Sequence, residues 1–175
     1  MTTDNLVAPL SRLSIFAGLK PSQLTQITQA AERLRYWPGD VITKAGQTGD
    51  GAYLIVSGTA QRVAGPGAAA TPENVAPGSL VGEMAMLIEH EYTSTIVAGD
   101  RVFCLKVLRS ALHAQMLADP SIAQHFHDRI TEQLIRTAEE LRRIDKDFAK
   151  DFAAHGFGAS QPAPAKFVAA TYGRH

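Results

Sequence analysis

The sequence predicts an α+β fold in which a small β-barrel or β-sandwich is flanked by helices. Apolar residues recur with the 3.6-residue period of a helix near the start of the chain and again after Val107. The stretch between, from Val41, contains only brief β-prone runs, punctuated by glycines at positions 39, 46, 49, 51, 58, 78 and 99. With 175 residues, of which 45% are hydrophobic, the chain has enough material for one domain with a closed core.

The N-terminal helices are predicted within residues 8–36. Pro21 suits the first turn of a helix, and the apolar residues after it keep helical spacing until Trp37-Pro38-Gly39 interrupts the pattern. These apolar residues are Leu24, Ile27, Ala31 and Leu34.

The β-roll is predicted over residues 37–107. Its strand-forming runs are VIT, YLIV, STIV and VFCLKV. Residues 64–78, AGPGAAATPENVAPG, are rich in Ala, Gly and Pro and predict a flexible connection between two strands.

The C-terminal helices are predicted within residues 108–153, which complete a domain of residues 1–153. Asp119-Pro120 separates a short helix from a long one that runs from about Ser121 to near Phe152. Residues 154–175 contain several glycines and prolines and predict a flexible tail.

The long helix carries an apolar stripe with the 3.5-residue repeat of a helix–helix seam. Its members are Ile130, Leu134, Thr137, Leu141, Ile144 and Phe148. Homodimerisation through this helix is the simplest use of the stripe. The alternative is that it covers the barrel of its own chain.

The charge and cysteine content restrict the partners and the compartment. Seventeen Lys and Arg balance seventeen Asp and Glu, so no global field attracts DNA or an anionic membrane. The single cysteine, Cys104, lies in a strand-like run and is expected to be a buried, inert thiol. No apolar run near the start is long enough for a signal peptide or a membrane span, so we expect a cytoplasmic protein.

Four stretches of the chain resemble the cyclic-nucleotide-binding domain of catabolite-activator-type regulators, kinase regulatory subunits and gated channels. They are IFAGLKPSQLTQI, YWPGDVITKAGQTGDGAYLIVSGTA, LVGEMAMLIEHEYTSTIVAG and the long terminal helix. The resemblance implies a β jelly-roll barrel, a double-stranded β-helix, between the N-terminal helices and the long C-terminal helix. The glycines of the second stretch permit the tight corners that such a roll requires.

The third stretch resembles the family's phosphate-binding cassette, which is a Gly-Glu, a helical turn, a loop and then Arg-x-Ala-Thr-Val. Gly82 and Glu83 match the start, Met84 and Ala85 begin the turn, and Thr93 and Ser94 follow the arginine position. In the family the turn binds the exocyclic phosphate with its N–H groups, the glutamate accepts from the ribose hydroxyl, and the arginine binds a phosphate oxygen.

The arginine position itself falls on Tyr92, and residues 63–100 contain no Lys or Arg. We therefore expect no local cation in the pocket. A hydrogen bond to a charged group contributes about 1.5–3 kcal/mol, so its loss should weaken a cyclic nucleotide by about tenfold to more than a hundredfold. Partial replacements are the Thr93 hydroxyl, the Tyr92 hydroxyl, a protonated His90, or an arginine from a second subunit.

In activator-type members of the family, a threonine on the long helix contacts adenine, and Thr137 stands at the equivalent place. The alternative is that its hydroxyl bonds to the preceding turn of its own helix. Residues 154–175 are too few for a helix-turn-helix, so no DNA-reading module is expected. No catalytic motif and no metal-ligand spacing stands out, since His125 and His127 point to different sides of a helix.

Two functions agree with these observations. The first is a non-enzymatic regulatory or sensor module that binds cAMP, cGMP or another nucleotide weakly and signals to a protein partner through its C-terminal helix. The second is a ligand-free dimeric scaffold or accessory subunit of a larger complex, with a redox enzyme such as a soluble NAD-reducing hydrogenase as one example.

Overall fold

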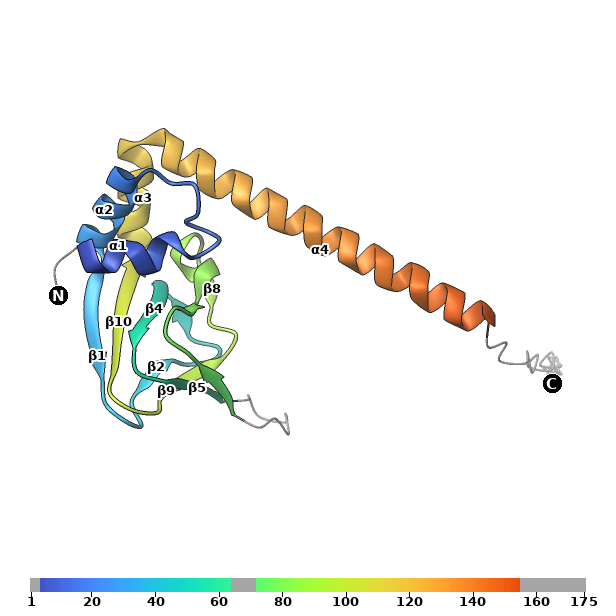
Figure 1. The fold of residues 1–175 in the computed structure, drawn as a ribbon, viewed down its shortest axis with the longest axis horizontal. Coiled ribbons are helices and arrows are strands. Elements are labelled where there is room, and N and C mark those ends of the chain that lie inside the picture. The colour runs from blue at the N-terminus through green and yellow to red at the C-terminus, as the bar shows by residue number, and fades with distance from the viewer. Residues whose placement is uncertain (1–3, 64–71, 155–175) are drawn as a thin grey trace, which may run out of the picture. The chain divides into compact units, whose positions relative to one another are not determined.

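The computed structural model describes residues 4–63 and 72–154 and divides the chain into two units, Met1–Thr131 and Glu132–His175. In the first unit, helices gather at one end of a β-roll (Figure 1). The elements begin with α1 (Asp4–Ser11), α2 (Pro21–Ala30), β1 (Glu32–Tyr36), β2 (Val41–Thr43), β3 (Thr48–Gly49), β4 (Gly51–Ser57) and β5 (Ala60–Val63). They continue with β6 (Glu73–Val75), β7 (Leu80–Val81), the 3-10 helix η1 (Glu83–Met86), β8 (His90–Glu91), β9 (Thr95–Ala98), β10 (Val102–Leu108), α3 (Arg109–Ala118) and α4 (Pro120–Ala154).

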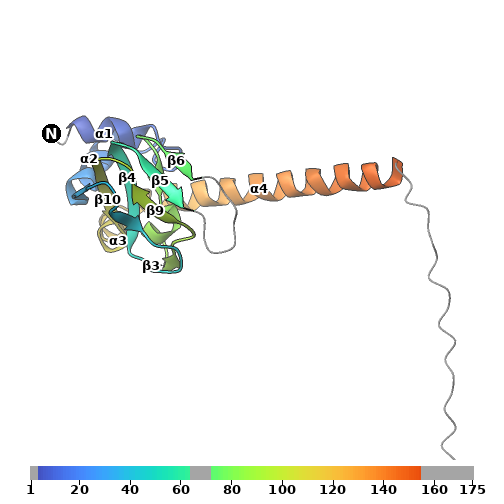
Figure 2. The same cartoon turned by 90° about the horizontal axis from the view of Figure 1, so that it is seen from below.

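Within the described ranges, the strands form two four-stranded antiparallel sheets and one two-stranded ladder. The strand orders are β1-β10-β4-β7, β2-β9-β5-β6 and β3-β8. Paired strands such as β5 and β9 lie side by side in the view from below (Figure 2). This arrangement confirms the predicted α+β jelly-roll fold.

Strand β4 is buried on both faces because it lies between two cores. Ala52 and Leu54 belong to the core that the helices cover, whereas Tyr53 and Ile55 belong to the core inside the roll. Alternate side chains of a strand point to opposite faces. This explains why the run reads as continuously apolar rather than as alternating.

The same alternation governs β10. Leu105 and Val107 face the helices, and Val102, Cys104 and Lys106 face the inside of the roll. The thiol of Cys104 is fully buried, which confirms the expected burial, and burial raises its pKa to about 12. The position of Lys106 places an ammonium group among the buried side chains of the roll.

The first strand corrects the predicted extent of the N-terminal helices. Helix α2 ends at Ala30, and Ala31 has extended backbone angles, so residues 32–36 form β1 instead of a last helical turn. This segment pairs antiparallel with β10, and Leu34 and Tyr36 pack on the inner core. Leu34 fits both a helical and a two-residue period, and the strand pairing decides between them.

The predicted connection 64–78 is also partly wrong. Residues 73–75 form strand β6, which pairs with β5, and Val75 is buried in the inner core. Residues 64–71 lie outside the described part of the chain.

The two C-terminal helices agree with the prediction. Asp119 caps the N-terminus of α4, because its Oδ1 accepts a hydrogen bond of 3.0 Å from the N–H of Ser121. Its other oxygen accepts one of 2.7 Å from Gln23 of α2. The predicted tail beyond Ala154 lies outside the described residues. Within the described ranges, none of the helices combines the length and the hydropathy that a membrane span requires.

In the second unit, the predicted seam lies on exposed helix surface. Leu134, Leu141 and Ile144 are 66%, 60% and 56% exposed. The side chain of Phe148 lies outside the described part of the chain. The first member of the stripe, Ile130, belongs to the first unit, where it is half-buried against the core that the helices cover.

Candidate functional site

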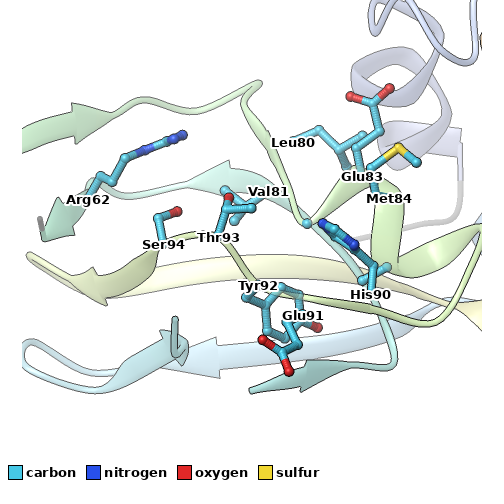
Figure 3. Close-up of a pocket in the computed structure, with 12 residues that line it drawn as sticks. Arg62, Leu80, Val81, Glu83, Met84, His90, Glu91, Tyr92, Thr93 and Ser94 are labelled. Carbon is cyan, nitrogen blue, oxygen red and sulfur yellow. The ribbon is translucent and has the colours of Figure 1, made fainter. Parts of the chain in front are cut away.

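A pocket of about 220 Å³ opens beside η1 and contains seven of the eight predicted site residues (Figure 3). These seven are Gly82, Glu83, Met84, Ala85, Tyr92, Thr93 and Ser94. The pocket is completed by residues that precede η1, by β8 and by Arg62 of β5. The structure therefore joins the turn and the loop that the sequence placed in one cassette.

The turn depends on Gly82, which precedes η1 with a φ of 75° in the left-handed region. Its carbonyl accepts a hydrogen bond of 2.9 Å from the N–H of Ala85. A Cβ atom here would lie 2.6 Å from the ring of Tyr92, so both the φ angle and the packing require glycine. The same ring lies 2.9 Å from where a Cβ of Gly49 would be.

The side chain of Tyr92 points away from the Thr93 side of the pocket (Figure 3). Its ring lies on the opposite side of the chain from the Thr93 hydroxyl (Figure 3), and the residue is only 7% exposed. Its hydroxyl donates to the carbonyl of Gly51 at 2.9 Å and reaches Oδ1 of Asp50 at 3.4 Å. Burial raises the pKa of this phenol, so it stays a neutral donor. Tyr92 closes the floor of the pocket from inside the roll.

The carboxylate that contacts the Tyr92 hydroxyl belongs to Asp50, which forms an ion pair with Lys106. The Lys106 Nζ atom lies 2.7 Å from Oδ2 of Asp50, with only 11% of the lysine side chain exposed. Burial acts to raise the pKa of Asp50, but the hydrogen bond and charge of Lys106 outweigh it and lower the pKa. The ammonium group also lies 5.3 Å from the centre of the Tyr53 ring.

Arg62 lines the pocket, which overturns the expectation that no local cation is present. It lies on β5 opposite Ile96 of β9, so the sheet brings it beside the loop that carries Thr93 and Ser94. Arg62 and Glu83 stand on opposite sides of the pocket (Figure 3). Only the pairing of the TAQRV run with the STIV run could have revealed this residue, because along the chain it lies far from the cassette.

Arg62 is available to a ligand. Its Nε atom lies 3.4 Å from Glu73, but both side chains are exposed, at 45% and 71%. An exposed ion pair of this kind contributes about 0–1 kcal/mol and exchanges readily for another partner. A phosphate oxygen would form a charge-assisted pair with the guanidinium in place of the Glu73 carboxylate.

The other ionisable groups of the pocket are mainly acidic. Glu83 and Glu91 are acidic, and the only additional basic group among the described lining residues is the imidazole of His90. Burial raises the pKa of Glu83, because its carboxylate is only partly hydrated.

Two residues of α3, Arg109 and His113, bind backbone carbonyls in and near η1. The Nη1 atom of Arg109 lies 2.8, 3.2 and 3.0 Å from the carbonyl oxygens of Gly49, Ala85 and Ile88. The Nε2 atom of His113 donates to the carbonyl of Leu87 at 2.8 Å. The contacts with Ala85, Leu87 and Ile88 satisfy carbonyls in the helical turn and directly after it. They form an Arg109–His113 clamp that fixes the cassette to α3.

The eighth predicted residue, Thr137, lies in α4 within the second unit, and its contact with adenine stays a prediction. Of the two helix histidines noted in the sequence, His125 is half-buried, and its Nε2 lies 2.9 Å from the carbonyl of Ile15. Among the residues that the structure describes, no three His, Cys, Asp or Glu side chains gather to hold a metal ion.

Comparison with known proteins agrees with this geometry. Residues 33–119 match the sequence profile of the cyclic nucleotide-binding domain. The CRP-like cAMP-activated global transcriptional regulator of Mycobacterium tuberculosis is 27% identical over 143 residues, which cover 80% of this chain and 60% of the regulator. The cAMP-dependent protein kinase regulatory subunit of Dictyostelium discoideum is 27% identical over 147 residues, which cover 83% of this chain and 44% of that subunit.

The chain thus spans only 60% and 44% of the lengths of these two relatives. Among solved structures, the N-terminal domain of a transcriptional regulator from Streptomyces coelicolor superposes with a TM-score of 0.70 at 21% identity. The superposition covers 76% of this chain and 94% of that domain, and at this identity it shows the fold alone. Through the matched domain, the chain belongs to the cyclic nucleotide-binding domain family.

Proposed function

We propose that the chain is a non-enzymatic regulatory module that binds a nucleotide weakly in the cassette and signals to a protein partner. One observation carries the proposal: a single pocket joins the Gly82 turn, the Thr93 and Ser94 hydroxyls, and the guanidinium of Arg62. A phosphate in this pocket would have N–H donors from the turn, hydroxyl donors from the loop and one cation. The regulatory roles named for the relatives support the same class of function.

Weak binding follows from the size and charge of the pocket. Its volume of about 220 Å³ is below the roughly 300–1,000 Å³ typical of small-molecule sites. Position 92 contributes no cation, Arg62 is half-exposed, and the acidic residues Glu83 and Glu91 are among those that line the pocket. We therefore expect an affinity weaker than about 10 µM for cAMP.

The Arg109–His113 clamp supplies a route for the signal. A ligand that rearranges η1 changes the carbonyls that Arg109 and His113 bind, and these two residues lie on the first turns of α3. Helix α3 leads directly into α4 through Asp119. The exposed seam of α4 is where we place a second copy of the chain, as a homodimer.

The alternative function is a ligand-free dimeric scaffold or accessory subunit of a larger complex. It is favoured by the buried Tyr92, which stands at the arginine position and whose hydroxyl is tied to Gly51 and Asp50 inside the roll. In that role the cassette would be a rigid part of the roll, and α4 would provide the docking face.

Isothermal titration calorimetry with cAMP, cGMP and other nucleotides separates the two functions. The sensor predicts heat of binding for at least one nucleotide, and competition between that nucleotide and inorganic phosphate. Absence of heat for all of them at millimolar concentration favours the scaffold. Under the scaffold, the same chain would still form a dimer in sedimentation experiments.

A further inference from the structure

The charged residues of α4 are ordered around its seam. In a 3.5-residue repeat, the positions directly before the first seam residue of each heptad and directly after the second flank the seam. Leu134 and Leu141 are first members of their heptads, and Thr137 and Ile144 are second members. In the second unit, the flanking residues with described side chains are Gln133, Ala138, Glu140 and Asp145.

The two charged residues among these, Glu140 and Asp145, are both acidic and both exposed. Arg136 and Arg143 lie one turn from Glu140 on the same helix. Within the described ranges, however, neither Glu140 nor Asp145 forms an ion pair. The edges of the seam therefore carry negative charge that is open to a partner.

The basic residues of this part of the helix all occupy other positions of the heptad. Between positions 132 and 146 they are Arg136, Arg142, Arg143 and Lys146. Charge is thus segregated, with acids beside the seam and cations on the remaining faces. Residues beside a helix–helix seam select the partner, because they meet the flanking residues of the other helix.

A second copy of the chain matches the seam but not its edges. In a parallel pair, Glu140 would face Asp145 of the partner subunit on both sides of the seam. In an antiparallel pair the charged flanking residues are again acidic, because both helices have the same sequence. Like charges at these positions weaken the pairing. A second copy therefore covers the apolar residues and leaves the acids without a flanking cation.

We propose that the seam of α4 binds an amphipathic helix of a protein partner with Lys or Arg at its flanking positions, in preference to a second copy of this chain. Apolar residues of that helix would cover Leu134, Leu141 and Ile144, and its cations would pair with Glu140 and Asp145. The homodimer and this complex use the same surface and exclude each other. The inference rests on the proposed function, which places a docking helix at this seam, and it names the chemistry of the partner.

The test uses the full chain and two synthetic helical peptides that share one Leu and Ile seam. One peptide has Lys at the flanking positions and the other has Glu. Two exposed pairs that change from attractive to repulsive should alter the affinity by about tenfold in favour of the Lys peptide, as measured by fluorescence anisotropy. The preference should shrink as salt is added, because exposed charges are screened. In sedimentation experiments, the Lys peptide should convert the homodimer to a one-to-one complex.

Charge reversal provides the matched comparison. Glu140→Lys/Asp145→Lys should reverse the preference and bind the Glu peptide more tightly. Glu132→Lys/Glu139→Lys makes the same change in net charge at positions away from the seam and should keep the preference for the Lys peptide.

Two results would overturn the inference, namely equal affinity of the wild-type chain for both peptides, or the same reversal in both double variants. A wild-type chain that stays dimeric and binds neither peptide also overturns it, while the homodimer of the proposed function stands. A chain that is monomeric without peptide yet binds the Lys peptide removes the homodimer and supports the basic partner.

Discussion

The Nζ atom of Lys106 and Oδ2 of Asp50 lie 2.7 Å apart, so the carboxylate at the pocket floor is paired with a cation from inside the roll. The two residues are separated by 56 positions in the sequence and meet because β10 pairs with β4. Tyr92 adds its hydroxyl to the same carboxylate. These contacts hold Tyr92, and with it the cassette, on the inner side of the roll. The exposed cation that lines the pocket is Arg62.

Replacement of Asp50 should lower the free energy of unfolding more than replacement of Lys106. Asp50→Asn leaves a buried ammonium without its carboxylate, which costs about 1–3 kcal/mol of unfolding free energy. Lys106→Met keeps the apolar contact with Tyr53 and leaves a carboxylate that is 60% exposed, so we expect a loss below about 1 kcal/mol. Urea unfolding measures both values. A larger loss for Lys106→Met than for Asp50→Asn contradicts this account of the pair.

The pair also predicts a pH dependence. Because the folded state lowers the pKa of Asp50 below 3.8, its contribution to stability is fully present above that pH and is lost as the pH falls through the lower, folded value. Urea midpoints measured from about pH 6 down to about pH 3 should therefore fall less steeply in Lys106→Met than in the wild-type protein. If the urea midpoints of the two proteins fall in parallel with pH, Lys106 does not lower the pKa of Asp50.

Tyr92→Arg should not restore tight cAMP binding. The side chain of this position points into the roll, where an arginine would meet Lys106 and compete with it for Asp50. We expect a loss of about 1–3 kcal/mol in stability, most of it recovered in Tyr92→Arg/Lys106→Met. Thermal unfolding and calorimetry with cAMP check both parts. A single variant that is stable and binds cAMP more tightly would show that the chain can turn residue 92 toward the pocket.

Arg109→Met should loosen the cassette. Three carbonyls lose a charged donor, each contact of this kind contributing about 1.5–3 kcal/mol, so amide exchange across residues 83–88 should accelerate by about tenfold or more. Hydrogen-exchange mass spectrometry gives the rates. The exposed Arg142 supplies a control, Arg142→Met, which should leave the exchange of η1 unchanged. Unaltered exchange in Arg109→Met would remove the clamp from the proposed signal route.

The seam of α4 predicts a dimer that a charge disrupts. Leu141→Lys places an ammonium in the seam and should convert the dimer to a monomer, as measured by sedimentation equilibrium. Ile135 is also apolar and 54% exposed but lies outside the seam, so Ile135→Lys is a matched control that should remain dimeric. A wild-type chain that sediments as a monomer at high concentration would contradict the homodimer.

Local patterns predicted the elements whose period is unambiguous. Pro21 and Asp119-Pro120 begin helices where expected, and the YLIV and VFCLKV runs become the two central strands. The run from Glu32 to Tyr36 was misassigned, because a single Leu34 satisfies both periods and the partner strand lies some seventy residues further along the chain. Short segments of this kind are decided by pairing rather than by local preference.

The same limit applies to the site. Gly82, Glu83 and the Thr93 and Ser94 hydroxyls follow one another closely in sequence, so one motif revealed them together. Arg62 and Lys106 lie on other strands, β5 and β10. The strand pairing that brings them to the site cannot be read from local sequence patterns. The charge of the pocket was therefore misjudged, although the backbone that forms it was identified.

The most direct test of the account compares cAMP binding by calorimetry in the wild-type protein, Arg62→Ala and Tyr92→Phe. If Arg62 is the cation that receives the phosphate and Tyr92 is a structural floor, Arg62→Ala weakens binding by about tenfold or more, whereas Tyr92→Phe changes it by less than about threefold. An affinity that is unchanged in Arg62→Ala, or that is abolished only in Tyr92→Phe, would contradict it.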